Sequence, residues 1–85
     1  MFKVTRIDAG SYPAQFRTYA IGTYADFWEA CRWAHGQAKA MAYSNNAEVY
    51  STCYDGDGVA TYTVEHRAGM NGTSRDCGVV TVERV

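Results

Sequence analysis

What this chain lacks limits its function before any motif is considered. It has no run of basic residues, since its eight Lys and Arg are spread singly and its formal net charge is −1. The electrostatic surface typical of a duplex-binding protein is therefore missing. No segment approaches the roughly 20 apolar residues of a membrane span. We therefore expect neither a duplex binder nor a protein that contacts a membrane.

A secretory signal is also missing, because Lys3 and Arg6 interrupt the amino-terminal segment and no apolar core follows them. The three cysteines, Cys31, Cys53 and Cys77, are odd in number and form no Cys-x-x-Cys pair. These features predict a cytoplasmic protein with reduced thiols. Cys77 is expected to be the most accessible thiol, since it falls in the longest predicted loop, residues 68–78.

Catalytic and metal-binding motifs are not evident. The 85 residues make one domain, residues 1–85, with a thin core and little room for a deep pocket. Cys77 with His66 is the one nucleophile–base pairing to consider, and no spacing requires it. Asp55-Gly56-Asp57-Gly58 lacks the remaining ligands and flanking helices of a calcium loop, so a hairpin turn is the better interpretation. We expect no enzyme, no metal and no cofactor.

The best-defined element is a helix over residues 23–44. Thr23 is predicted to be its N-cap, with Asp26 three residues further on. The apolar positions recur at spacings of four and three, which places them on one side of a helix. They are Phe27, Cys31, Ala34, Ala38 and Met41. Because most of them are small, the helix can lie close against whatever it covers.

Strand patterns flank this helix on both sides. Residues 2–8 and 15–21 precede it, and residues 48–54, 59–67 and 79–85 follow it. The order β-β-α-β-β-β predicts an α+β domain with a single helix packed on one face of an antiparallel sheet. Alternation in the last three strands places Tyr50, Thr52 and Tyr54 on the opposite, solvated face, together with further Thr and Glu residues.

Trp33 is the first candidate for a binding residue. It lies about 120° from the Phe27 side of the helix, beside Glu29, and should be largely exposed. An exposed Trp on a small domain is a natural interface anchor. The alternatives are that a loop around Tyr12 and Pro13 covers it, or that it lies in the core of a homodimer.

A second stripe runs beside the buried side of the helix and contains Trp28, Arg32, His35 and Lys39. Arg32 is one turn beyond Trp28 and can stack on its indole. The stripe is either a mixed aromatic and basic contact surface or a solvated flank. Trp28 is expected to lie nearer to the core than Trp33.

The outer face of the sheet offers a different kind of site. Tyr50 and Tyr54 could stack unpaired bases there, as sheet aromatics do in single-strand binders. Lys3 and Arg17 could flank this face, whereas Glu65 and Glu83 lie on it. The alternative is an ordinary solvated face.

A stand-alone small α+β chain that begins at Met1 and has no catalytic motif resembles, in size and plan, the accessory proteins of bacteriophages and mobile elements, and some anti-CRISPR proteins. The resemblance implies a subunit of a CRISPR interference complex as partner, in the cytoplasm of a bacterial host. The main hypothesis is thus a protein-binding inhibitor that acts by steric occlusion. The alternative is single-stranded nucleic-acid binding through the Tyr and Thr sheet face.

Overall fold

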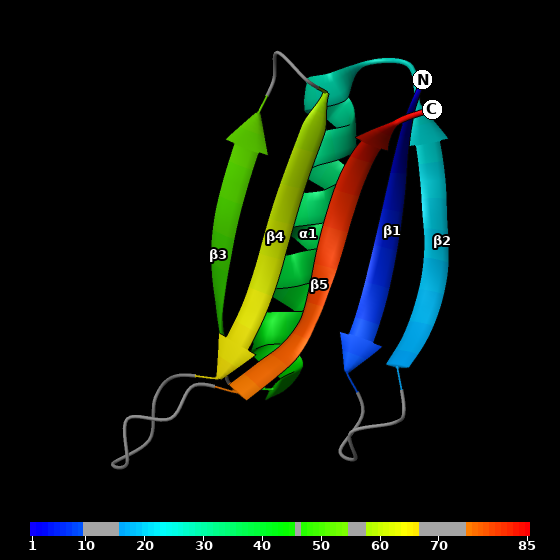
Figure 1. Ribbon diagram of the computed structural model, residues 1–85. Coiled ribbons are helices and arrows are strands. Elements are labelled where there is room, and N and C mark those ends of the chain that lie inside the picture. The colour runs from blue at the N-terminus through cyan, green and yellow to red at the C-terminus, as the bar shows by residue number, and fades with distance from the viewer. Residues whose placement is uncertain (10–15, 46, 55–57, 67–74) are drawn as a thin grey trace.

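A computed structural model of the chain describes residues 1–9, 16–45, 47–54, 58–66 and 75–85. The strands form one antiparallel sheet in the order β2-β1-β5-β4-β3, and helix α1 packs on one face of it (Figure 1). The elements are β1 Phe2–Ala9, β2 Phe16–Tyr24, α1 Phe27–Asn45, β3 Ala47–Tyr54, β4 Val59–His66 and β5 Arg75–Arg84. The predicted α+β fold and its β-β-α-β-β-β order are confirmed.

The helix begins later than its sequence pattern predicted. Thr23 and Tyr24 remain in β2, where they pair with Lys3 and Phe2. Asp26 is the residue that caps α1, because its Oδ2 accepts a hydrogen bond of 3.1 Å from the backbone N–H of Glu29. The prediction of Thr23 as N-cap was therefore wrong, since strand pairing with β1 holds that residue in an extended conformation.

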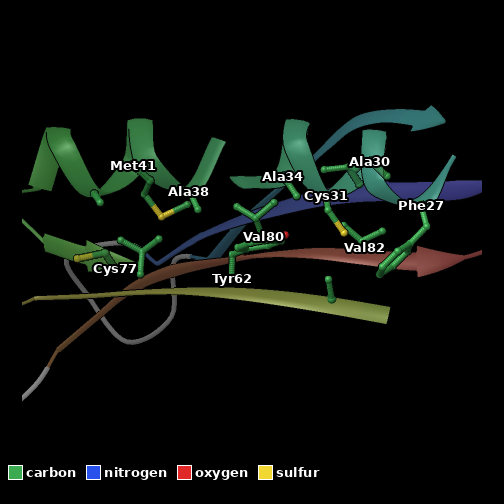
Figure 2. Close-up of a cluster of buried hydrophobic side chains, with 14 residues drawn as sticks. Phe27, Ala30, Cys31, Ala34, Ala38, Met41, Tyr62, Cys77, Val80 and Val82 are labelled. Carbon is green, nitrogen blue, oxygen red and sulfur yellow. The ribbon is translucent and has the colours of Figure 1, made fainter. Parts of the chain in front are cut away.

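The core lies between α1 and the middle of the sheet (Figure 2). On the helix side, Ala30, Ala34 and Ala38 are completely buried. Small side chains at these positions let the helix axis approach the sheet closely, so that Met41 and Phe27 fill the two ends of the contact. The sheet contributes a set of fully buried residues, which are Val4, Ala60, Val64, Val80 and Val82.

Strand β5 occupies the centre of the sheet and runs closest to the helix. A side chain on Gly78 would collide with the carbonyl oxygen of Ile7 in β1 and would lie 2.7 Å from Sδ of Met41. A bulge between β4 and β5 follows from the extra residue, Cys77. Cys77 is buried, with 8% of its surface exposed. The prediction that it lies in a loop was therefore wrong, because β5 begins at Arg75 and carries this residue into the core. Its ranking as the most accessible thiol stays a prediction, since the side chain of Cys53 lies outside the described residues.

The predicted facing of the carboxyl-terminal strands is confirmed where side chains are described. Tyr62 is buried beneath the helix. Thr61, Thr63 and Thr81 alternate with buried neighbours and therefore lie on the opposite face. We call this sheet face, turned away from α1 and towards the viewer in Figure 1, the open face. The turn before β4 has Gly58 at a φ of 67°, as the Asp-Gly pattern indicated.

Two glycines provide a matched test of this packing. Gly78→Ala should lower the free energy of unfolding by about 1–3 kcal/mol or more, because the added methyl group overpacks the contact between β1, β5 and α1. Gly36→Ala in α1 should raise it by about 0.5–1 kcal/mol, since no heavy atom outside its own helical neighbourhood lies within 4 Å of that position. Urea denaturation of both variants measures the difference. Equal effects would contradict the close approach of helix and sheet.

Candidate functional site

The indole of Trp33 is held in a defined orientation on one flank of α1. The side chain has 51% of its surface exposed. Its ring stacks on that of Tyr24, with centroids 6.1 Å apart and planes 12° from parallel. The expectation that Trp33 is substantially exposed is confirmed, and one of its faces has an aromatic support from β2. The loop around Tyr12 and Pro13, which was the alternative cover, lies outside the described residues.

The support depends on the glycine two residues before Tyr24. Gly22 pairs with Val4 and Tyr24 pairs with Phe2, so both residues lie on the helix side of β2. A Cβ atom on Gly22 would come within 2.9 Å of Oη of Tyr24. The missing side chain therefore lets the tyrosine ring lie back over the strand, as aromatic rings do beside strand glycines. Tyr24 also packs against the core, which fixes the platform under Trp33.

A groove of about 410 Å³ continues along the same flank. It is lined by residues of β1, β2 and α1, which are Arg6, Asp8, Tyr19, Ala20, Ile21 and Gln37. Gln37 follows Trp33 by four residues and therefore lies one helical turn further along the same side. The groove exists because α1 packs on β5, β4, β3 and β1 and contacts β2 only slightly. We call Trp33, Tyr24 and this groove together the β2-side surface.

The polar wall of the groove is ordered by Arg6. Its Nε donates to Oδ1 of Asp8 at 2.7 Å, and its Nη2 donates to Oδ2 of the same carboxylate at 3.3 Å. Its Nη1 donates to Oε1 of Gln37 at 3.0 Å, which joins β1 to α1. A two-point contact of this kind fixes the guanidinium plane. The charges of Arg6 and Asp8 cancel, so the groove is polar on one wall without a strong charge of either sign.

The opposite flank of α1 carries the second predicted stripe. Trp28 meets the edge of Phe27 at a centroid distance of 5.2 Å and has 59% of its surface exposed. Trp28 does contact the core residue Phe27, as its predicted position nearer to the core implies, but it is no less exposed than Trp33. Arg32 and Lys39 are exposed, and the ring of His35 stacks on that of Tyr62 at 5.5 Å. This flank borders β4, so the two Trp residues cannot belong to one contiguous patch.

The remaining predicted residues lie elsewhere. Glu29 is exposed in the first turn of α1. Tyr50 is exposed on the open face, and its hydroxyl donates to Oε2 of Glu48 at 3.0 Å. Tyr54 belongs to β3, but its side chain is outside the described part of the structure. The predicted residues are thus divided among the two helix flanks and the open face.

The charges on the open face do not favour a polyanion. By register, this face carries Lys3 together with Glu48, Glu65 and Glu83. Arg17 lies opposite Asp8 in the register of β1 and β2, and Asp8 is on the helix side of the sheet. Arg17 therefore belongs to the helix side and does not flank the open face as predicted. Among the described residues, acidic side chains therefore outnumber basic ones where a nucleic acid would need cations.

The residues considered for catalysis and metal binding are described only in part. No group of three or more His, Cys, Asp or Glu side chains within this part of the chain could hold a metal ion. Cys77 is buried, and the side chain of His66 lies outside the described residues, as do residues 55–57. Within the same part of the chain, no helix is both long and apolar enough to cross a bilayer.

Sequence reasoning missed the groove and the contribution of Tyr24. Arg6 and Asp8 share a face of β1 by simple alternation, which was a usable signal. Gln37 joins them only through the placement of α1 over the sheet, which is a long-range property. The predicted strand 15–21 ends before Gly22, whereas β2 continues through this residue to Tyr24, whose ring covers it.

Comparison of the chain with protein-family models, with curated proteins and with solved structures finds no match. Function is therefore inferred from the geometry and charge of this chain's own surfaces.

The stack beneath Trp33 can be tested directly. In a Trp28→Phe background, Trp33 is the single tryptophan. Tyr24→Ala should then increase acrylamide quenching of its fluorescence and lower the free energy of unfolding by at least about 0.5–1.5 kcal/mol, the value of an aromatic pair. Tyr24→Phe, which retains the ring, is the control. If Tyr24→Ala changes neither quantity, the stack does not exist in solution.

Proposed function

We propose that this chain is a small protein-binding module that inhibits a macromolecular partner by occluding one of its surfaces. The partner contacts the β2-side surface, and Trp33 is the central anchor. The resemblance to anti-CRISPR proteins suggests the partner class, a subunit of a CRISPR interference complex in the cytoplasm of a bacterial host. The chain itself performs no chemistry.

The observation that carries this proposal is the stacked and half-exposed indole of Trp33 beside a groove. An aromatic ring whose rotamer is already fixed loses little conformational freedom when it is buried by a partner. The Tyr24 ring supplies that restraint at 6.1 Å. Tyr19, with 43% of its surface exposed, extends the aromatic surface along β2. Trp and Tyr are among the residues most enriched at energetically dominant interface positions.

The groove adds shape and polar complementarity to this anchor. Its volume of about 410 Å³ accommodates one or two side chains of a partner. Arg6 and Gln37 present oriented hydrogen-bonding groups on its wall, and Ile21 presents an apolar side chain. Because Arg6 is already paired with Asp8, binding does not depend on opposite net charge. Such an interface should tolerate salt, in contrast to a nucleic-acid complex.

Trp33→Ala should abolish most of the affinity while leaving the fold intact. The partner is first recovered by affinity pull-down from a bacterial lysate, identified by mass spectrometry and purified. Loss of a central Trp is worth about 2 kcal/mol or more, so the dissociation constant should rise by about 30-fold or more. The loss of unfolding free energy should not exceed about 1.5 kcal/mol, the value of the stack.

Trp28→Ala is the matched control, because it removes an indole of similar exposure from the opposite flank of the same helix. Its dissociation constant should stay near that of the unmodified chain. The proposal fails if Trp28→Ala weakens binding and Trp33→Ala does not. It also fails if affinity drops by tenfold or more between about 50 and 200 mM salt, which is typical of phosphate contacts.

A further inference from the structure

Among the described residues, the centre of the open face carries no charged side chain. Two rows of residues cross the three central strands, as the pairing registers show. One row contains Thr5, Thr81 and Thr61, and the other contains Ile7, Val79 and Thr63. All six side chains are partly exposed, and no described element covers them (Figure 1). The solvated face of an antiparallel sheet is usually polar, whereas Ile7 and Val79 place two apolar side chains at the centre of this one.

The charges of this face stand at the ends of the strands. Lys3 pairs with Glu83 beyond the threonine row, and Glu65 pairs with Glu48 beyond the other row. An uncharged centre within a charged rim is the arrangement found in protein–protein interfaces. The β-branched side chains of the centre have few rotamers, so burying them costs little conformational entropy.

We propose that this open face is a homodimer interface, in which two sheets pack face to face and both helices point outwards. A second copy fits better than a different partner because the centre offers no charge that could select an opposite one. Strand β5 is the third of five in the sheet. A two-fold axis near Val79 therefore places the uncharged rows of one copy against those of the other, as an isologous contact requires.

The available area is sufficient for such a dimer. Five strands at a spacing of about 4.8 Å and eight residues at about 3.3 Å give a face of about 24 by 26 Å. Two such faces bury about 1,200 Å² in total, which is the lower end of stable interfaces. Aligned packing at about −30° accommodates the twist of both sheets. The β2-side surface remains exposed in each copy, so the dimer is independent of the proposed function and would make the module bivalent.

Sedimentation equilibrium of the purified chain alone, from about 1 µM to about 1 mM, tests this inference. The unmodified chain should form a reversible dimer in this range, as expected for a small interface. Val79→Lys places like charges beside the two-fold axis and should raise the dimer dissociation constant by about 100-fold or more. Val79→Thr, which keeps the β-branched shape and adds a hydroxyl but no charge, should raise it far less than Val79→Lys does.

Three results would overturn the proposal. They are a chain that stays monomeric at about 1 mM, a dimer that Val79→Lys leaves intact, and a dimer that Trp33→Ala dissociates. The last result would place the contact on the helix flank. Because Val79 borders solvent in the monomer, its lysine variant should keep the melting temperature at low concentration. If it does not, Thr63→Lys in the neighbouring strand provides the same test.

Discussion

The close approach of α1 to β5 is the contact on which the rest of the structure depends. Ala30, Ala34 and Ala38 present almost no side chain towards the sheet, and Gly78 presents none towards the helix. A domain this small buries little apolar surface, so its stability rests on how completely that surface is packed. The small residues achieve this by bringing the valines of the central strands into direct contact with the helix.

The position of the helix also decides which surfaces stay uncovered. Because α1 is centred over β5, it contacts β2 only slightly, and a groove remains beside that contact. Tyr24 lies back over Gly22 at one end of this space and supports Trp33. The other sheet face has no covering element among the described residues. The position of α1 on the sheet therefore leaves both the β2-side surface and the open face uncovered.

Local patterns predicted most of the fold. The spacing of Phe27, Cys31 and Ala34 gave the buried side of α1, and Trp33 was placed on the exposed side from the helical period alone. The helix start was predicted four residues too early because pairing of Tyr24 with Phe2 competes with the capping signal at Thr23. The burial of Cys77 was not predicted. Pairing with β4 across a bulge extends β5 to residues before the predicted strand 79–85, and Cys77 is one of them.

The candidate site could be predicted only in part. An exposed indole follows from periodicity, but its aromatic support and the groove arise from three elements that are far apart in the sequence. Arg6, Gln37 and Tyr24 meet only once the sheet order and the helix position are known. The separation of Trp28 from Trp33 onto opposite flanks follows from their five-residue spacing. The similar exposure of the two indoles does not follow from this spacing, because it depends on which strands border each flank of the helix.

The most direct test of the account uses the indole N–H signals of the two tryptophans. Proton–nitrogen correlation spectra of the labelled chain contain one such signal for each, and Trp28→Phe assigns them. On titration with the purified partner, the account predicts that the Trp33 indole signal shifts or broadens while the Trp28 signal stays in place. A spectrum in which the Trp28 signal alone responds, or in which neither responds to a partner that binds, would contradict it.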